Sequence, residues 1–265
     1  MNKLAALLKM SNRRNFEEKA LFITYLITVV IILVIGCIIG ALAVLNPMVA
    51  NPETPPEEIS FAYMTILLCM MTIAVGICYS VMLAVPMTKD KANGNIESML
   101  AASANIKDIW IAKTIALFLI SLIAALVLVI PAALILKIAC IPSEVTLTLN
   151  PWFLLTTFVS VPVMYLCECF LITIIALCFS AEAGNVIGAV FCPAMTILTI
   201  NLVAKKALDP GTPILFLIHL ALGAVMLVVS ILLYRKVDKE KVVLSCKAAG
   251  TTTRGKRRPI RAAKA

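Results

Sequence analysis

Two ionisable side chains, Glu168 and His219, stand inside long apolar runs of the sequence, where they could carry proton or metal chemistry. A carboxylate in the middle of a membrane span is costly, and it commonly serves a proton or cation site with a facing partner. The other interpretation of Glu168 is a protonated or hydrogen-bonded side chain in the seam between two helices. We favour the second interpretation, because a proton-coupled carrier usually has more than one such group. His219 has no cysteine or carboxylate near it in sequence, so we expect it to be packed or hydrogen-bonded rather than a ligand.

The sequence contains no catalytic or nucleotide-binding motif that we recognise. It lacks G-x-x-x-x-G-K-[ST], H-E-x-x-H and G-x-S-x-G, the patterns that bind phosphate, hold zinc or present a nucleophilic serine. None of its nine cysteines forms a C-x-x-C pair, and we expect them to fill helix packing as small hydrophobes. We therefore expect this chain to be no enzyme and to hold no metal and no cofactor.

The elements that must position these groups are predicted to be membrane-spanning helices. Hydrophobic residues make up 62% of the 265 residues and charged residues 14%, with a mean hydropathy of +1.04. The apolar residues form runs long enough to cross a bilayer, which takes about 20 residues, and a β-barrel would show short alternating strands instead. The fold class is therefore all-α integral membrane. The six predicted spans are 20–45, 61–87, 109–136, 152–179, 186–203 and 214–234. The stretch Asn46–Ser60 between the first two spans contains four prolines, and proline at this density predicts a short non-helical loop on the outer side.

The segments outside the spans predict an orientation through their charges. Residues 1–19 are expected to form an amphipathic helix in the membrane interface, and residues 235–265 a basic tail that is largely disordered. Five lysines and arginines precede the first span, four lie between the second and third spans, and eleven lie in the tail, so 20 of the 23 share one side. Because retained basic residues mark the cytoplasm, we predict a multi-pass plasma-membrane protein with both termini cytoplasmic. The first apolar run is far longer than the core of a cleavable signal peptide, so we expect it to remain as an anchor.

Three lysines fall on the predicted outer side: Lys137, Lys205 and Lys206. The adjacent pair is the exception to the charge rule. A re-entrant or interfacial segment after the fifth span would account for it, as would side chains that reach back to the headgroups.

The one long polar segment between apolar runs is Thr88–Lys113. Asn95 can cap a helix with Glu97 near its positive end, and Ile96 would then share one face with Met99 and Leu100. This pattern predicts a short amphipathic helix that lies flat under the membrane.

A second helix start follows within the same segment. Asn105 with Asp108 three residues later resembles a capping box, and it begins the helix that becomes the third span. Lys107 and Lys113 would then sit at the level of the headgroups. Together the two helices form a rigid polar elbow, which can transmit a push as a tilt.

The order of these residues resembles the signature of the ABC-2 type transporter permeases. That signature is roughly D/E-K/R-x-x-G-x-x-E-x-L-L, followed by small residues and by an isoleucine and a lysine that open the third helix. The matching stretch covers about 25 residues between the second and third of six spans. It comprises Asp90-Lys91, Gly94, Glu97, Met99-Leu100, and Ile106-Lys107-Asp108-Ile109 through Lys113.

The resemblance implies a membrane subunit of an ATP-binding cassette exporter. The segment from Lys89 to Ser103 would seat in a groove of a separate ATPase subunit. The residues it nominates for coupling are Lys89, Asp90, Lys91, Gly94, Glu97, Met99, Leu100, Lys107 and Asp108.

The resemblance also implies a dimer with a second permease subunit, identical or different, and a transport path between the two. The first and fifth spans would meet at the interface, with Gly36, Gly40 and Gly188 as candidates for close helix approach. The second span would help to line the path, with the hydroxyls of Thr65, Thr72 and Tyr79 as candidates, although such hydroxyls also bond to neighbouring helices. The partners expected are therefore the ATPase, the second permease and the bilayer, and not nucleic acid.

Another function class stays open, namely a secondary transporter that couples to an ion gradient through Glu168. Transporters of that class commonly contain internal repeats, and the two halves of this chain show no convincing one.

Overall fold

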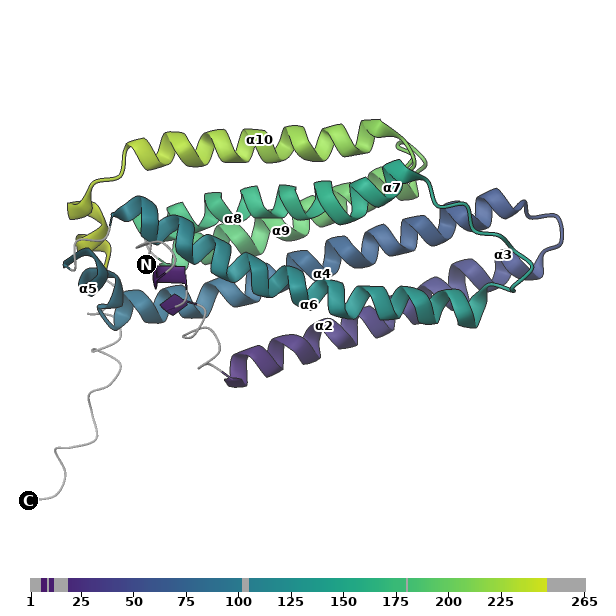
Figure 1. Ribbon diagram of the computed structural model, residues 1–265, viewed down its shortest axis with the longest axis horizontal. Coiled ribbons are helices and arrows are strands. Elements are labelled where there is room, and N and C mark those ends of the chain that lie inside the picture. Colours follow the sequence, from purple (N-terminus) through teal and green to yellow (C-terminus); the bar gives the residue numbers. More distant parts are fainter. Residues whose placement is uncertain (1–5, 9, 12–18, 102–104, 180, 247–265) are drawn as a thin grey trace, which may run out of the picture.

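The computed structural model describes residues 6–8, 10–11, 19–101, 105–179 and 181–246. The described chain is almost entirely helical, and its long helices run side by side along one axis (Figure 1). In chain order the elements are α2 (Lys19–Ile39), the π-helical turn η1 (Gly40–Leu45), α3 (Asn46–Ala50), α4 (Pro56–Ala92), α5 (Asn95–Ala101), α6 (Ile106–Cys140), α7 (Pro151–Leu155), the π-helical turn η2 (Thr156–Ser160), α8 (Val161–Cys178), α9 (Ala181–Ala204) and α10 (Pro213–Arg235). A further helical segment covers residues 239–246.

Six helical stretches of the described chain are long and apolar enough to cross a membrane. They comprise α2 continued through η1 and α3, then α4, α6, α7 continued through η2 and α8, α9, and finally α10. Each stretch reaches or exceeds the roughly 17–25 residues that cross the hydrocarbon core of a bilayer. The predicted fold class, an all-α multi-pass membrane protein, is confirmed.

Two of the spans form the centre of the bundle. In the spanning stretches, 67% of the residues of α4 and 72% of those of α7–α8 are buried, against 17% for α2 and 18% for α9. Helix α4 packs against α2, α6, α8 and α9, and α8 also packs against α10 and α6. The outer helices therefore present broad apolar faces to whatever surrounds the bundle, and these faces suit lipid or another membrane subunit.

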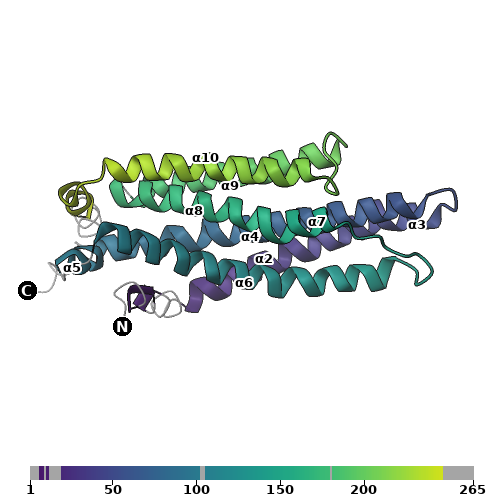
Figure 2. The ribbon, with the colours of Figure 1, turned by 45° about the horizontal axis from the view of Figure 1, so that its top comes forward.

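The bundle has two distinct ends (Figures 1 and 2). At one end lie α5, the start of α6 and the segment 239–246; we call this the α5 end. At the other lie α3 and the connection from α6 to α7; we call this the α3 end. Of the predicted interfacial helix 1–19, residues 6–8 and 10–11 are helical and the others, except Lys19, lie outside the described residues.

Several helices extend beyond the predicted spans, among them α6 and α9, and two of the differences have a clear cause. The second span was predicted to end at 87, yet α4 continues to Ala92, and its last turn carries Lys89 and Lys91, where basic side chains stabilise the helix dipole. The stretch Asn46–Ser60 was predicted to be a non-helical loop, and this was wrong for most of it, since only 51–55 lie outside helices. The prolines explain the difference: Pro47 and Pro56 stand in first helical turns, where a missing N–H is tolerated.

The turn that follows the C-terminus of α9 contains a lysine in an unusual backbone conformation. Lys206 has φ +54°, its N–H donates to the carbonyl of Val203 at 2.9 Å, and the N–H of Ala207 donates to that of Leu202 at 3.0 Å. This is the Schellman arrangement, in which the left-handed position is usually glycine. A lysine there costs about 1–2 kcal/mol relative to a right-handed residue, and the turn fixes where the side chain projects at the α3 end.

Candidate functional site

The polar segment at the α5 end begins with a tight turn between α4 and α5. Gly94 has φ +69°, its N–H donates to the carbonyl of Lys91 at 3.1 Å, and its own carbonyl accepts from the N–H of Ser98 at 2.9 Å. An added Cβ at Gly94 would meet only a carboxylate oxygen of Glu97, at 3.7 Å. The turn therefore requires glycine for its backbone conformation and not for space.

The predicted cap of α5 was wrong in its residue. Because Ser98 bonds to the carbonyl of Gly94 and α5 begins at Asn95, Gly94 occupies the cap position and Asn95 lies one residue inside the helix. The predicted capping box of α6 was also wrong, since Asn105 stands at the N-cap without a side-chain cap bond. Asp108 still lies in the first turn of α6, where a carboxylate favours the helix dipole.

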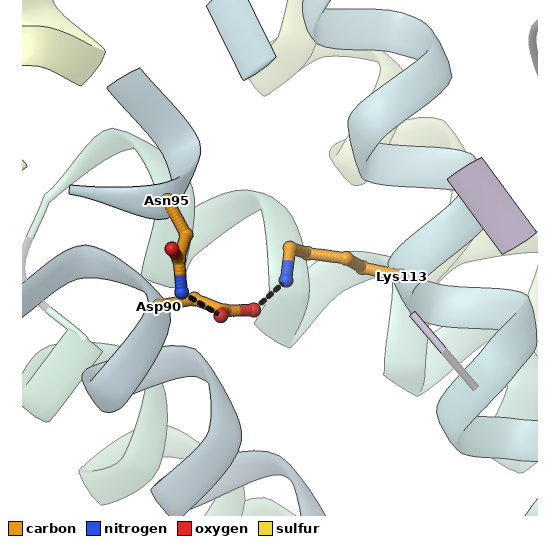
Figure 3. A network of polar contacts seen from close by, with 3 residues as sticks. All are labelled: Asp90, Asn95 and Lys113. Atoms are coloured by element: carbon orange, nitrogen blue, oxygen red, sulfur yellow. Dashed lines mark hydrogen bonds and ion pairs between the residues drawn. The ribbon is translucent and has the colours of Figure 1, made fainter. Parts of the chain in front are cut away.

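A buried ion pair closes this turn onto α6 (Figure 3). The ammonium of Lys113 donates to one carboxylate oxygen of Asp90, and the side-chain amide of Asn95 donates to the other at 2.9 Å. Asp90 is 7% exposed and Lys113 is 6% exposed. The end of α4, the start of α5 and the first turns of α6 are thus held by one carboxylate, and the ammonium of Lys113 faces that carboxylate inside the bundle.

A second buried cation ties α4 to the end of α8. The ammonium of Lys91 donates to the carbonyls of Leu177 at 3.2 Å and Phe179 at 3.1 Å, and to the hydroxyl of Ser245 at 2.8 Å. Removal from water lowers the pKa of Lys91 below its usual range. The three acceptors compensate the burial, because a cation at a helix C-terminus satisfies carbonyls that have no partner within the helix.

An apolar cluster lies under α5 and includes residues from the segment 239–246, at the start of the C-terminal tail. Ile96 of α5 is fully buried, and it shares this cluster with Trp110 of α6, Leu177 of α8, and Val242 and Cys246 of the segment 239–246. The first part of the predicted tail is therefore packed and helical, whereas the basic cluster expected to be disordered lies outside the described residues.

The indole of Trp110 links this cluster to two more helices. Its N–H donates to the carbonyl of Phe170 at 2.9 Å. Its ring meets that of Phe170 edge-on, with centroids 5.3 Å apart, and stacks on Tyr234 at 5.5 Å with 11° between the planes. Helices α5, α6, α8 and α10 therefore meet at Trp110. We use the word junction for this meeting point together with the polar contacts of Asp90 and Lys91.

The nine predicted coupling residues divide by burial. Asp90 and Lys91 are buried, so within this chain they hold the junction. Lys89 and Lys107 are exposed, and the remaining five are partly exposed: Gly94, Glu97, Met99, Leu100 and Asp108. The prediction missed Trp110, Ser245 and Val242, and the apolar i, i+4 pair Val242 and Cys246 is the one sequence signal that pointed to packing there.

Two of the three predicted path-lining hydroxyls bond within their own helix. Thr65 donates to the carbonyl of Phe61 at 2.9 Å, and Thr72 donates to that of Leu68 at 2.7 Å. Thr65 lines a cavity at the α3 end, whereas Thr72 is fully buried. The side chain of Tyr79 lies outside the described residues.

The three glycines predicted for an interface behave differently. A Cβ at Gly40 would come within 3.1 Å of Ile66, and one at Gly188 within 3.3 Å of Ile172, so both pack against helices of the same chain. A Cβ at Gly36 would meet nothing within 4 Å. Of the three, only Gly36 therefore leaves room on the surface of the bundle.

Glu168 is fully buried on α8, and neither carboxylate oxygen has a hydrogen-bond partner among the described residues. His219 on α10 places Nε2 3.2 Å from the hydroxyl of Thr199 and leaves Nδ1 without a partner there. The two groups do not pair with each other. Across the described chain no cluster of three histidine, cysteine or acidic side chains could hold a metal ion.

The fold and this junction define a polytopic helical membrane protein whose second and third spans are joined by a short, rigid, polar helix. Comparison with protein families gives a match over residues 2–221 to the ABC-2 type transporter family. The chain belongs to that family, and it is a transporter permease subunit. Comparison with curated proteins and comparison with solved structures each gave no match.

Proposed function

We propose that this chain is the permease subunit of an ABC exporter, and that it is driven by a separate ATPase subunit which docks at the α5 end. The observation that carries this proposal is the junction. A short helix, α5, is connected to α4 by the glycine turn and to α6 by the ion pair of Asp90 and Lys113. A load on α5 therefore moves two spanning helices together rather than bending a loop.

The polar contacts of Lys91 and Trp110 extend this link. Through them, α8 and α10 share the junction with α4 and α6. Since α4 and α8 form the buried centre of the bundle, a rotation of the junction would reach the interior of the spanning region. The chain has no P-loop with which to generate such motion itself.

The partner would contact the outward side of the junction. Lys89, Ser98, Ala101 and Lys107 are exposed there. The predicted orientation puts this end in the cytoplasm, where ATP is available, because most of the lysines and arginines belong to that side.

The proposal includes a dimer of permease subunits in the plasma membrane. Helices α2 and α9 have the smallest buried shares of the six spans, 17% and 18%, and these are the two spans for which an interface was predicted. A second permease subunit would cover part of those faces, and lipid would cover the remainder.

The alternative, an ion-coupled carrier that uses Glu168, rests on one observation: a fully buried carboxylate without a hydrogen-bond partner. Coupling to an ion would require a counter-charge or ligand group beside it, and the described residues supply none. Glu168→Gln tests this alternative directly. We expect the variant to assemble and transport as the wild type does, and loss of transport with intact assembly would favour the carrier.

The test of the proposal is purification of the tagged chain from its native membrane in mild detergent, followed by mass spectrometry of what accompanies it. We expect a P-loop ATPase and a second permease in the complex. We also expect Glu97→Ala to keep the complex and lose ATP-driven transport. Recovery of a fully transporting chain with no ATPase present would refute the proposal.

A further inference from the structure

The α3 end contains a cavity that the junction does not involve. Its volume is about 980 Å³, at the upper end of the range of about 300–1,000 Å³ for small-molecule sites. The wall comes from η1 and α3, the first turns of α4, and the two connections that precede α7 and α10. Its apolar part includes Val44, Met48, Phe61, Met64 and Ile66.

The cavity is lined by more acidic than basic side chains. Glu57, Glu58 and Asp209 contribute carboxylates, and Lys206 contributes one ammonium. No ion pair within 4.0 Å joins Lys206 to any of the three among the described residues. The cavity therefore combines an apolar wall with an excess of negative charge at its edge.

Among the described residues that line the cavity, the one cation lies over an aromatic ring. The ammonium of Lys206 lies 6.0 Å from the centroid of the Phe61 ring, within the range in which a ring attracts a cation. The left-handed backbone at Lys206 places it there, in a position that usually belongs to glycine. Lys206 is one of the two lysines that are exceptions to the charge rule, and its contact with Phe61 gives it a local role at the α3 end.

From this arrangement we infer that the cavity binds an amphipathic organic cation, whose apolar body lies along the α4 wall. Its charged group replaces the Lys206 ammonium over the Phe61 ring, in the cavity that the glutamates also line. Lys206 acts as a tethered competitor that occupies the cation position when no ligand is present. Thr65, on the second span, borders the same cavity. That the cavity belongs to the transport path rests on the proposed export function, whereas the binding itself does not.

The experiment measures binding to the isolated subunit, so that it does not depend on an ATPase. The full chain is placed in phosphatidylcholine nanodiscs, which leave both faces open. Fluorescence anisotropy then follows titration with rhodamine 6G, an amphipathic cation, and with a sulfonated rhodamine of similar size that carries net negative charge. Empty nanodiscs supply the background of partition into lipid.

We expect saturable binding of the cationic probe alone. Glu57→Gln combined with Glu58→Gln should weaken it about tenfold, the effect of losing two exposed charge contacts. Lys206→Asn should tighten it about threefold by removing the competitor. Asparagine tolerates the left-handed backbone, and Lys206→Gly, which suits that backbone better, must act in the same direction.

Lys205→Asn is the matched control, because it removes the same charge from an exposed neighbour that does not line the cavity. It should leave the affinity for the cationic probe unchanged. Binding of the anionic probe with equal strength, weaker cation binding in both Lys206 variants, or no saturable signal above empty nanodiscs would each overturn the inference. None of these results would bear on ATPase docking at the α5 end.

Discussion

Asp90 near the end of α4 and Lys113 in α6 form a buried ion pair, although 23 residues separate them in the sequence. Asn95 of α5 donates to the same carboxylate. One acidic side chain thereby joins three helices at the point where the chain turns. A partner that pushes on α5 would act on α4 and α6 as one body.

Removing one partner of this ion pair should destabilise the protein more than removing both partners together. Lys113→Met removes the cation that faces the buried carboxylate of Asp90, so we expect a loss of about 3–5 kcal/mol of stability. The double variant Asp90→Leu with Lys113→Met should recover part of that loss, because it removes both charges together. Thermal unfolding in detergent gives the Tm values of the wild type and the variants, and their order tests this expectation. A double variant with a Tm below that of either single variant would contradict a direct pairing.

The turn at Gly94 should respond to backbone conformation and not to side-chain size. Gly94→Val is expected to cost about 1–2 kcal/mol, because a β-branched residue is strained at positive φ. Gly94→Asn should cost clearly less, since asparagine visits that region more readily. The same Tm measurement compares the two. Equal losses would indicate that crowding and not backbone strain makes glycine necessary.

The contact of Lys91 with Ser245 should keep the segment 239–246 on the junction. In the wild type Cys246 is 2% exposed, so a membrane-impermeant maleimide should label it slowly. Lys91→Met and Ser245→Ala each remove a hydrogen bond of the tie, and we expect faster labelling at Cys246 in both. Mass spectrometry assigns the label to that cysteine. Lys89→Met, at an exposed site on the same turn, is the control and should leave the rate unchanged.

Trp110 should contribute through its ring more than through its N–H. Trp110→Phe loses the bond to the carbonyl of Phe170 but keeps an aromatic ring beside Tyr234, so we expect a cost of about 1 kcal/mol. Trp110→Ala should cost about 3–5 kcal/mol, because it empties the cluster under α5. Unfolding of the two variants under the same conditions checks the order. If the two costs were equal, the ring contacts would carry little of the stability.

The local features of the fold could be predicted from the sequence, and the long-range pairings could not. Hydropathy alone located six spanning helices, and the spacing of Ile96, Met99 and Leu100 predicted a short amphipathic helix. On the face that these residues share, the structure buries Ile96 and leaves the other two partly exposed. The partner of Lys113 could not be predicted, because nothing local in the sequence indicates a carboxylate on another helix. Lys91 and Ser245 are more distant still, at 154 residues.

The prolines were misjudged, and the neighbours of the glycines could not be predicted, for a related reason. Pro47 and Pro56 suggested a loop by their density, but first-turn positions tolerate proline. Gly40 and Gly188 suggested contacts between subunits by their spacing and position in the spans, but the side chains they accommodate, Ile66 and Ile172, belong to the same chain. The glycines predicted that helices would pack closely at these positions, and only the structure identified which helices do so.

The most direct test of the central claim, that an ATPase docks on α5, is site-specific photocrosslinking in native membranes. A photoreactive amino acid at Ser98, which is exposed on α5, should crosslink to a P-loop ATPase. The same residue at Leu149, which is exposed at the α3 end, should not. Crosslinking of the ATPase from Leu149 and not from Ser98, in a complex that still contains both proteins, would contradict the account.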